Sequence, residues 1–142
     1  MNLINPWNSY RRIATQTASP GHLVLMLYDG AIRFLEQALG GFAKEDPAEF
    51  NLTIHTNLQR AQEIVRELNF SLNMTEGGQL ADNLRGLYSY MDRRLDESNR
   101  KKEQDGIHEV KRRLTILRDA WSAMLSGQGS DGASADPQLA AA

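Results

Sequence analysis

The fold of this chain is decided by one stretch, Ser19-Pro-Gly-His-Leu-Val-Leu-Met-Leu-Tyr-Asp-Gly-Ala-Ile-Arg-Phe-Leu35, which is its most apolar continuous segment. Ser19 is a favourable N-cap residue, and Pro20 occupies the first helical position, where its missing N–H has no hydrogen bond to lose. Gly40 and Gly41 supply a stop signal at the other end. The stretch therefore predicts a helix that begins after Ser19 and ends at this glycine pair.

The apolar side of this helix is unusually wide. At about 100° per residue, its apolar side chains cover an arc of about 200°, whereas a helix that packs on one side needs only about half of that width. Two interpretations follow. Either the helix is central and has neighbours on both flanks, or one flank is a docking surface for a partner absent from this chain, formed by Leu25, Tyr28, Ile32 and Leu39.

Three further stretches show the same helical period. Asp46-Pro-Ala-Glu49 combines an N-cap, a proline at the first position and a capping-box glutamate, and it starts a helix with an apolar stripe about 120° wide. A third helix follows Gly77-Gly78 and fades near Asn99, and a fourth follows with Asp105 as its cap. Four apolar residues lie off the stripes of these helices: Leu52, Phe70, Tyr90 and Ile116.

Four helices of about 20 residues joined by short turns predict an all-α fold, an antiparallel up-down-up-down four-helix bundle. We place the bundle at residues 19–126. Residues 1–18 contain Trp7 and Tyr10 without a lasting period, so we expect an N-terminal arm, with or without a short extra helix, whose aromatic side chains dock on a surface. Residues 127–142 are rich in Gly, Ser, Ala and Asp, which predicts a disordered C-terminal tail.

Composition excludes several classes of function. The chain of 142 residues has 16 basic and 18 acidic side chains and no cysteine. The near balance of charge argues against nucleic acid as a partner, and the lack of cysteine excludes disulfides and thiol catalysis. Because we find neither a stretch of 18 apolar residues nor a signal peptide, we expect a cytoplasmic protein that does not insert into a membrane by itself.

No set of residues suggests catalysis. His22, His55 and His108 lie on three different helices, and the apolar stripes contain no acidic residue to complete a di-metal site. Phosphate-binding loops and nucleophile motifs are missing from the sequence as well. We therefore expect no catalytic residues, no cofactor and no metal, and a function in binding amphipathic helices of a partner.

Basic residues gather around the turn between the third and fourth helices, with acidic residues among them. We expect a solvated, salt-bridged end of the bundle, and contact with an acidic protein surface is the alternative. The basic residues are Arg93, Arg94, Arg100, Lys101, Lys102, Lys111, Arg112 and Arg113.

Four pieces of the sequence stand in a distinctive order. They are Ser19-Pro20 with Met26-Leu27-Tyr28-Asp29-Gly30-Ala31; Gly77-Gly78 before Ala81-x-Asn83-Leu84 and Leu87-Tyr88-x-Tyr90-Met91-x-Arg93-Arg94-Leu95; Glu109-Val110; and Asp119-Ala120-Trp121. In this order and spacing they resemble the FliS family, the cytoplasmic export chaperones of bacterial flagellin, and the resemblance extends from Tyr10 to Leu125. Tyr10 matches an N-terminal tyrosine of the family, and Trp7 takes the apolar position three residues before it.

The resemblance implies a four-helix bundle that binds the C-terminal segment of flagellin, which is disordered when free and drives filament assembly. Binding prevents premature polymerisation, and the loaded chaperone then delivers flagellin to the flagellar type III export apparatus, where it contacts a membrane protein of the export gate. In the family the arm can cover part of the client groove and move aside. We expect the client to contact Trp7, Tyr10, Leu25, Tyr28, Ile32, Leu52, Phe70, Tyr90 and Ile116. The alternative is a helical interaction module or weak homodimer that does not have flagellin as its client.

Overall fold

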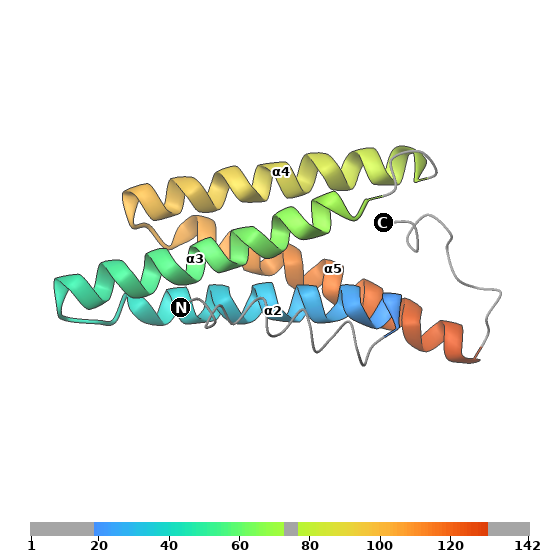
Figure 1. Cartoon of the computed structure of the whole chain (residues 1–142), viewed down its shortest axis with the longest axis horizontal. Helices are drawn as coiled ribbons and strands as arrows, with labels where there is room; N and C mark the ends of the chain where they lie inside the picture. Colours follow the sequence, from blue (N-terminus) through green and yellow to red (C-terminus); the bar gives the residue numbers. More distant parts are fainter. Residues whose placement is uncertain (1–18, 73–76, 131–142) are drawn as a thin grey trace, which may run out of the picture.

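The computed structural model describes residues 19–72 and 77–130 of the chain. Within these residues lie four helices: α2 (Pro20–Gly41), α3 (Pro47–Phe70), α4 (Gly78–Lys101) and α5 (Asp105–Ser130). Successive helices run in opposite directions; α2 packs between α3 and α5, and α4 closes the ring against the same two helices (Figure 1). The all-α, up-down-up-down bundle expected from the sequence is confirmed.

The first two helices begin where the capping residues predicted. The Ser19 hydroxyl accepts a hydrogen bond from the N–H of His22 at 3.3 Å, and the Asp46 carboxylate accepts one from the N–H of Glu49 at 3.0 Å. Each bond satisfies a backbone donor that has no partner within its own helix. Local sequence therefore determines both helix starts.

The boundaries of α5 differ from the prediction at both ends. Its first backbone hydrogen bond runs from the N–H of His108 to the carbonyl of Gln104, so Asp105 is not the cap but a residue of the first turn. Its negative charge there faces the positive end of the helix dipole. At the other end, α5 continues to Ser130, past the boundary at residue 126 that composition indicated. The expected N-terminal arm and residues 131–142 lie outside the described part of the chain.

Backbone conformation explains two of the connections. Gly78 has φ 59°, in the left-handed region that glycine adopts without strain, which accounts for a glycine at the start of α4. Lys102 ends α4 with φ 53°, and its ammonium group donates to the carbonyl of Asn99 at 2.8 Å. The turn between α2 and α3 is closed by an edge-to-face contact of Phe42 and Phe50, with ring centroids 5.5 Å apart.

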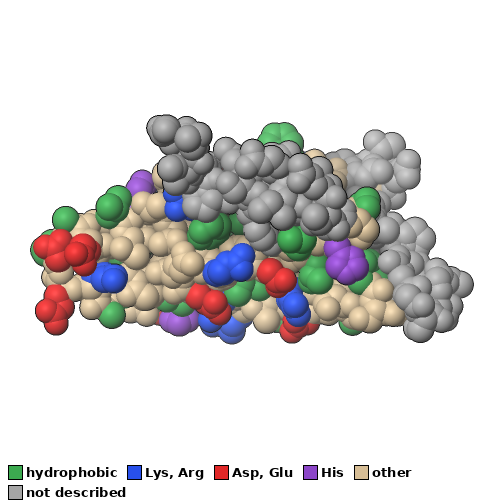
Figure 2. Space-filling model, turned by 60° about the horizontal axis from the view of Figure 1, so that its bottom comes forward, with side chains coloured by type: hydrophobic (Ala, Val, Ile, Leu, Met, Phe, Trp, Pro, Cys, Tyr) green, Lys and Arg blue, Asp and Glu red, His purple; other side chains and the backbone are tan. Residues whose placement is uncertain are grey.

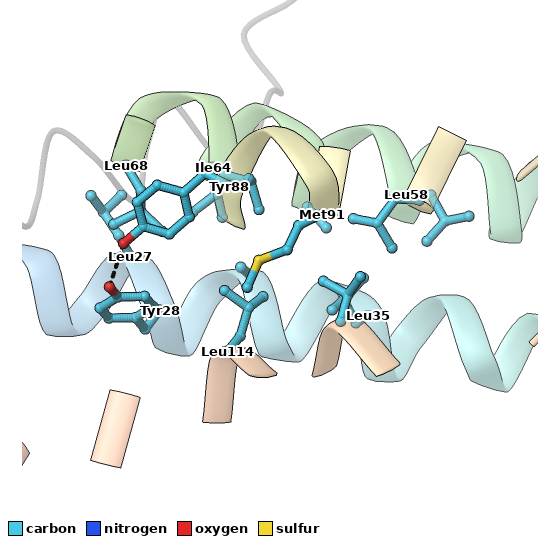
Figure 3. Close-up of a cluster of buried hydrophobic side chains, with 14 of the residues drawn as sticks. Leu27, Tyr28, Leu35, Leu58, Ile64, Leu68, Tyr88, Met91 and Leu114 are labelled. Carbon is cyan, nitrogen blue, oxygen red and sulfur yellow. Dashed lines mark hydrogen bonds between the residues drawn. The ribbon is translucent and has the colours of Figure 1, made fainter. Parts of the chain in front are cut away.

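One hydrophobic core runs along the bundle axis. Leu35, Leu58, Met91 and Leu114, one from each described helix, are fully buried and point toward one another (Figure 3). Burying such side chains contributes about 1.5–3 kcal/mol each before the entropy of ordering them is subtracted. The core members follow the predicted stripes: Leu27, Tyr28, Ala31, Leu35, Ala38, Ile54, Leu58, Ala61, Ile64, Val65, Leu68, Leu72, Ala81, Leu84, Tyr88, Met91, Leu95, Ile107, Val110, Leu114 and Trp121.

Two glycines mark places where α5 comes close to a neighbouring helix. At Gly21, an added Cβ atom would lie 2.6 Å from Leu125 Cδ2, and the carbonyl of Gly21 accepts a 2.7 Å hydrogen bond from the indole N–H of Trp121. At Gly106, an added Cβ atom would clash with the hydroxyl of Ser98 on α4. The small residues therefore set the distance of α5 from α2 and from α4.

Candidate partner-binding surface

Tyr28 lies in the core and not on the surface flank where we expected it. Its side chain is only 4% exposed, and its hydroxyl shares a 2.5 Å hydrogen bond with the hydroxyl of Tyr88 on α4 (Figure 3). Burial raises the pKa of both phenols, so both stay neutral. The pair joins α2 to α4 across the bundle, and we remove Tyr28 from the residues that can contact a partner directly.

Leu25 and Ile32 occupy an intermediate position. Both are half-buried and pack against the core from the edge of α2. They are seven residues apart, which places them on the same side of the helix, two turns from each other. The wide apolar arc of α2 is therefore explained partly by its two neighbours and partly by a flank that stays accessible.

Among the described residues, the large exposed apolar side chains are Leu52, Phe70 and Ile116, which are 66%, 83% and 68% exposed. Leu52 and Phe70 lie 18 residues apart on α3, which is about 27 Å along the helix axis. Ile116 lies on α5, which stands diagonally across the ring from α3. These side chains therefore do not form one patch but are distributed around the bundle.

Tyr90 makes internal contacts, although it lies off the apolar stripe of α4. Its hydroxyl donates to Glu109 Oε2 at 2.7 Å, and the guanidinium of Arg113 lies 5.6 Å from the centre of its ring. The hydrogen bond to Glu109 raises the pKa of the Tyr90 phenol. The side chain remains half-buried, so only part of it is accessible to a partner.

The same glutamate links α4 to α5. Glu109 accepts hydrogen bonds from Arg94 at 2.9 Å and from Arg113 at 3.0 Å in addition to the one from Tyr90. The hydrogen bond from Arg94, followed by that from Tyr90, lowers the pKa of Glu109 to about 2. Arg94 also pairs with Glu97 at 2.9 Å. The Glu109-Val110 pair thus combines an ion-pair centre with a core residue, since Val110 is fully buried.

A second polar contact links α2 to α5. Arg118 Nε donates to Asp29 Oδ1 at 2.8 Å, and Arg118 also pairs with Asp119 at 3.3 Å. Sequence reasoning missed the contact with Asp29, because its partner is 89 residues away and no local pattern connects them.

The outer side of α3 and α4 holds a polar hollow of about 450 Å³ that we did not predict. Gln62, which is 4% exposed, donates from its amide to Asp92 Oδ1 at 2.8 Å, and Arg66 holds the same carboxylate with two N–H groups at 3.0 and 3.1 Å. The signal in the sequence was a glutamine immediately beside the apolar stripe of α3. A buried amide there needs a polar partner on the neighbouring helix.

Figure 2 shows the side of the bundle that lies at the bottom of Figure 1, where hydrophobic side chains are visible among charged ones. No group of His, Asp and Glu within residues 19–72 and 77–130 has an arrangement that could hold a metal ion. In the same residues, no helix is long and apolar enough to cross a membrane. Trp7 and Tyr10 lie outside the described residues.

Comparison with known proteins places these features in a family. The model of the family described as flagellar protein FliS matches residues 3–128. A flagellar secretion chaperone FliS from Bacillus subtilis is 35% identical over 131 residues, which cover 92% of this chain and 94% of that protein. The flagellar secretion chaperone FliS from Salmonella typhimurium is 35% identical, over 76% of this chain and 78% of that protein. The flagellar secretion chaperone FliSB from Pseudomonas aeruginosa is 32% identical, over 75% of this chain and 82% of that protein. The chain therefore belongs to the FliS family of flagellar proteins.

Proposed function

We propose that this protein is a cytoplasmic export chaperone that binds the disordered C-terminal segment of flagellin. Binding prevents premature polymerisation, and the loaded complex delivers flagellin to the flagellar type III export apparatus by contacting the export gate in the membrane. The observation that carries the proposal is membership of the FliS family, whose relatives are named flagellar secretion chaperones. The proposal assigns no catalytic activity and no cofactor to the chain.

The distribution of exposed apolar side chains supports an extended client. Leu52, Phe70 and Ile116 lie on opposite sides of the ring and far apart along it, so one compact partner cannot cover all of them at once. A disordered segment that folds on binding can wrap around such a surface. Each side chain contributes about 1.5–3 kcal/mol when it is fully buried, which offsets part of the entropy lost in ordering the client.

The expected contact set changes in one respect. Leu25, Ile32 and Tyr90 are half-buried and keep an accessible edge, whereas Tyr28 is covered by the bundle. We assign client contact to Trp7, Tyr10, Leu25, Ile32, Leu52, Phe70, Tyr90 and Ile116, and a supporting role behind this surface to Tyr28.

The test is calorimetric titration of the full chain with a peptide of about 50 residues from the C-terminus of flagellin, at several temperatures, with circular dichroism of the mixture. Saturable one-to-one binding with a negative heat-capacity change and added helicity supports a client that folds while burying apolar surface. Absence of heat and of added helicity, with the bundle intact, would refute the proposal.

Two variants sharpen this test. Replacing Leu52, Phe70 and Ile116 together by serine should weaken binding while the fold persists, because all three are exposed. Replacing Gln37, an exposed polar residue of α2, by serine is the control and should leave binding unchanged. Sedimentation without peptide examines the alternative, a homodimer that does not bind flagellin. A dimer that forms with increasing protein concentration and dissociates in the triple variant would indicate a homodimerisation surface.

A further inference from the structure

The structure separates the basic residues around the α4–α5 turn into paired and unpaired groups. Most of them face a carboxylate: Arg94 and Arg113 bind Glu109, Lys101 lies 3.1 Å from Glu97, and Lys111 of α5 lies 3.4 Å from Glu36 of α2. These pairs explain a salt-bridged end of the bundle, as we expected. Within the described residues, Arg93 and Arg112 are the arginines of this group whose side chains have no carboxylate partner.

Arg93 differs from Arg112 in its surroundings. It lines the hollow between α3 and α4 together with two further arginines, one from each helix, namely Arg66 and Arg100. Arg112 instead lies on α5 beside the exposed Ile116. Three guanidinium groups thus converge on one concave surface, and one of them is unpaired.

The floor of the hollow is preorganised. Asp92 is held by the buried amide of Gln62 and by the two N–H groups of Arg66, so its charge is already compensated. The second carboxylate of the hollow, Asp96, is 3.8 Å from Arg100, and both side chains are 66% exposed, so this pair is loose and contributes little. Arg93 and Arg100 are therefore available to a carboxylate that approaches from outside.

The charge of the hollow indicates what it binds. Three guanidinium groups, those of Arg66, Arg93 and Arg100, against the two carboxylates of Asp92 and Asp96 leave one positive charge. One excess charge matches the monoanion of a glutamate or aspartate side chain, which a guanidinium binds through two parallel hydrogen bonds. A nucleic-acid backbone is a long polyanion, and a chain whose net charge is −2 provides no long-range attraction for it.

From this juxtaposition we propose that the α3–α4 hollow, lined by Gln62, Arg66, Asp92, Arg93, Asp96 and Arg100, is a docking site for an acidic segment of a partner protein. The acidic side chains bind Arg93 and Arg100, while Asp92, Gln62 and Arg66 keep the hollow in shape. The site is polar, whereas the residues assigned to the client are apolar, although Phe70 follows Arg66 by one turn of α3. The proposal therefore concerns a different kind of ligand and goes beyond binding of flagellin.

The test uses a capped hexaglutamate peptide, titrated at low salt into the full chain and followed through the arginine Nε–Hε signals in proton–nitrogen correlation spectra. Saturable shifts should be largest for Arg93 and Arg100. Arg93→Gln should raise the dissociation constant about fivefold or more, the loss expected for one solvent-accessible charge-assisted hydrogen bond. The substitution should not disturb the fold, because Arg93 is exposed and holds no other side chain in the described residues.

Arg112→Gln is the matched control, because it removes the same charge from another exposed arginine without a carboxylate partner, outside the hollow. It should change the dissociation constant by less than about twofold, as expected for a distant, screened charge. The proposal is overturned if hexaglutamate causes no saturable shift, if Arg112→Gln weakens binding as much as Arg93→Gln, or if inorganic phosphate shifts the same signals more strongly.

Discussion

The packing of α4 against α5 leads to a prediction in which one substitution has opposite effects at two glycines. At Gly106, near the start of α5, an added methyl group would clash with the hydroxyl of Ser98 and lie 3.2 Å from Arg94 Cγ. Ser98 is fully buried, and its hydroxyl has no hydrogen-bond partner among the described residues. At Gly86, in the exposed middle of α4, nothing lies within 4 Å of an added Cβ atom.

The magnitudes follow from these surroundings. Overpacking a close helix contact costs about 1–3 kcal/mol, and alanine returns about 0.5–1 kcal/mol of helix propensity. We therefore expect Gly106→Ala to lower the free energy of unfolding by about 1–2 kcal/mol. Gly86→Ala should raise it by about 0.5–1 kcal/mol, because only the propensity gain applies there.

Urea denaturation followed by circular dichroism measures both variants on the full chain. With a slope of about 1–3 kcal/mol per molar urea, the two midpoints should move in opposite directions by a readily measured fraction of a molar or more. The double variant Gly106→Ala/Ser98→Ala, which removes the clashing hydroxyl, should recover at least part of the loss. A Gly106→Ala midpoint equal to that of the original protein would show that α4 and α5 are not in close contact at this point.

Three further predictions concern single contacts. Phe70→Ala should leave the urea midpoint within experimental error and weaken flagellin binding in calorimetry, whereas the neighbouring Leu68→Ala should cost about 2–5 kcal/mol of stability because Leu68 is buried. Because the Glu109 carboxyl has a pKa of about 2 in the folded protein, against 4.5 ordinarily, its stabilisation is present above 4.5 and lost as the pH falls toward 2, so Glu109→Gln should reduce the acid sensitivity of the urea midpoint. Tyr28→Phe and Tyr88→Phe should each lower the free energy of unfolding by about 1–3 kcal/mol, because each leaves the other hydroxyl without its partner. In a double-mutant cycle the double variant should lose less than the sum of the two, since it leaves no hydroxyl unpaired.

Local patterns were sufficient for the fold. The N-caps Ser19 and Asp46 determine where helices begin through contacts three residues away, and such contacts are visible in the sequence. The period of apolar residues predicted which side chains are buried, and Leu52, Phe70 and Ile116 were correctly placed off the stripes. Asp105 was misplaced by one position because a residue of the first turn and a cap have similar acidic preferences.

The partner surface was harder to predict, because an angle on a helix does not say which neighbour faces it. Tyr28 fell on the flank of α2 that we considered as a docking surface, yet its hydroxyl meets that of Tyr88, a residue 60 positions later. A phenol also tolerates burial when its hydroxyl finds a partner, so its polarity was no guide to exposure. Contacts such as Trp121 with Gly21 join residues 100 positions apart and have no local signature.

The pair Arg93-Arg94 illustrates what three dimensions add to a charge pattern. Adjacent residues on a helix point about 100° apart, so Arg94 reaches Glu109 on α5, whereas Arg93 lines the hollow on the side of α3. Counting charges along the sequence treats the two as equivalent, and it left open both a solvated end of the bundle and contact with an acidic protein surface. Glu109 pairs with Arg94, whereas the two carboxylates of the hollow pair with Arg66 and Arg100, so one arginine stabilises the packing of α5 and its neighbour has no carboxylate partner.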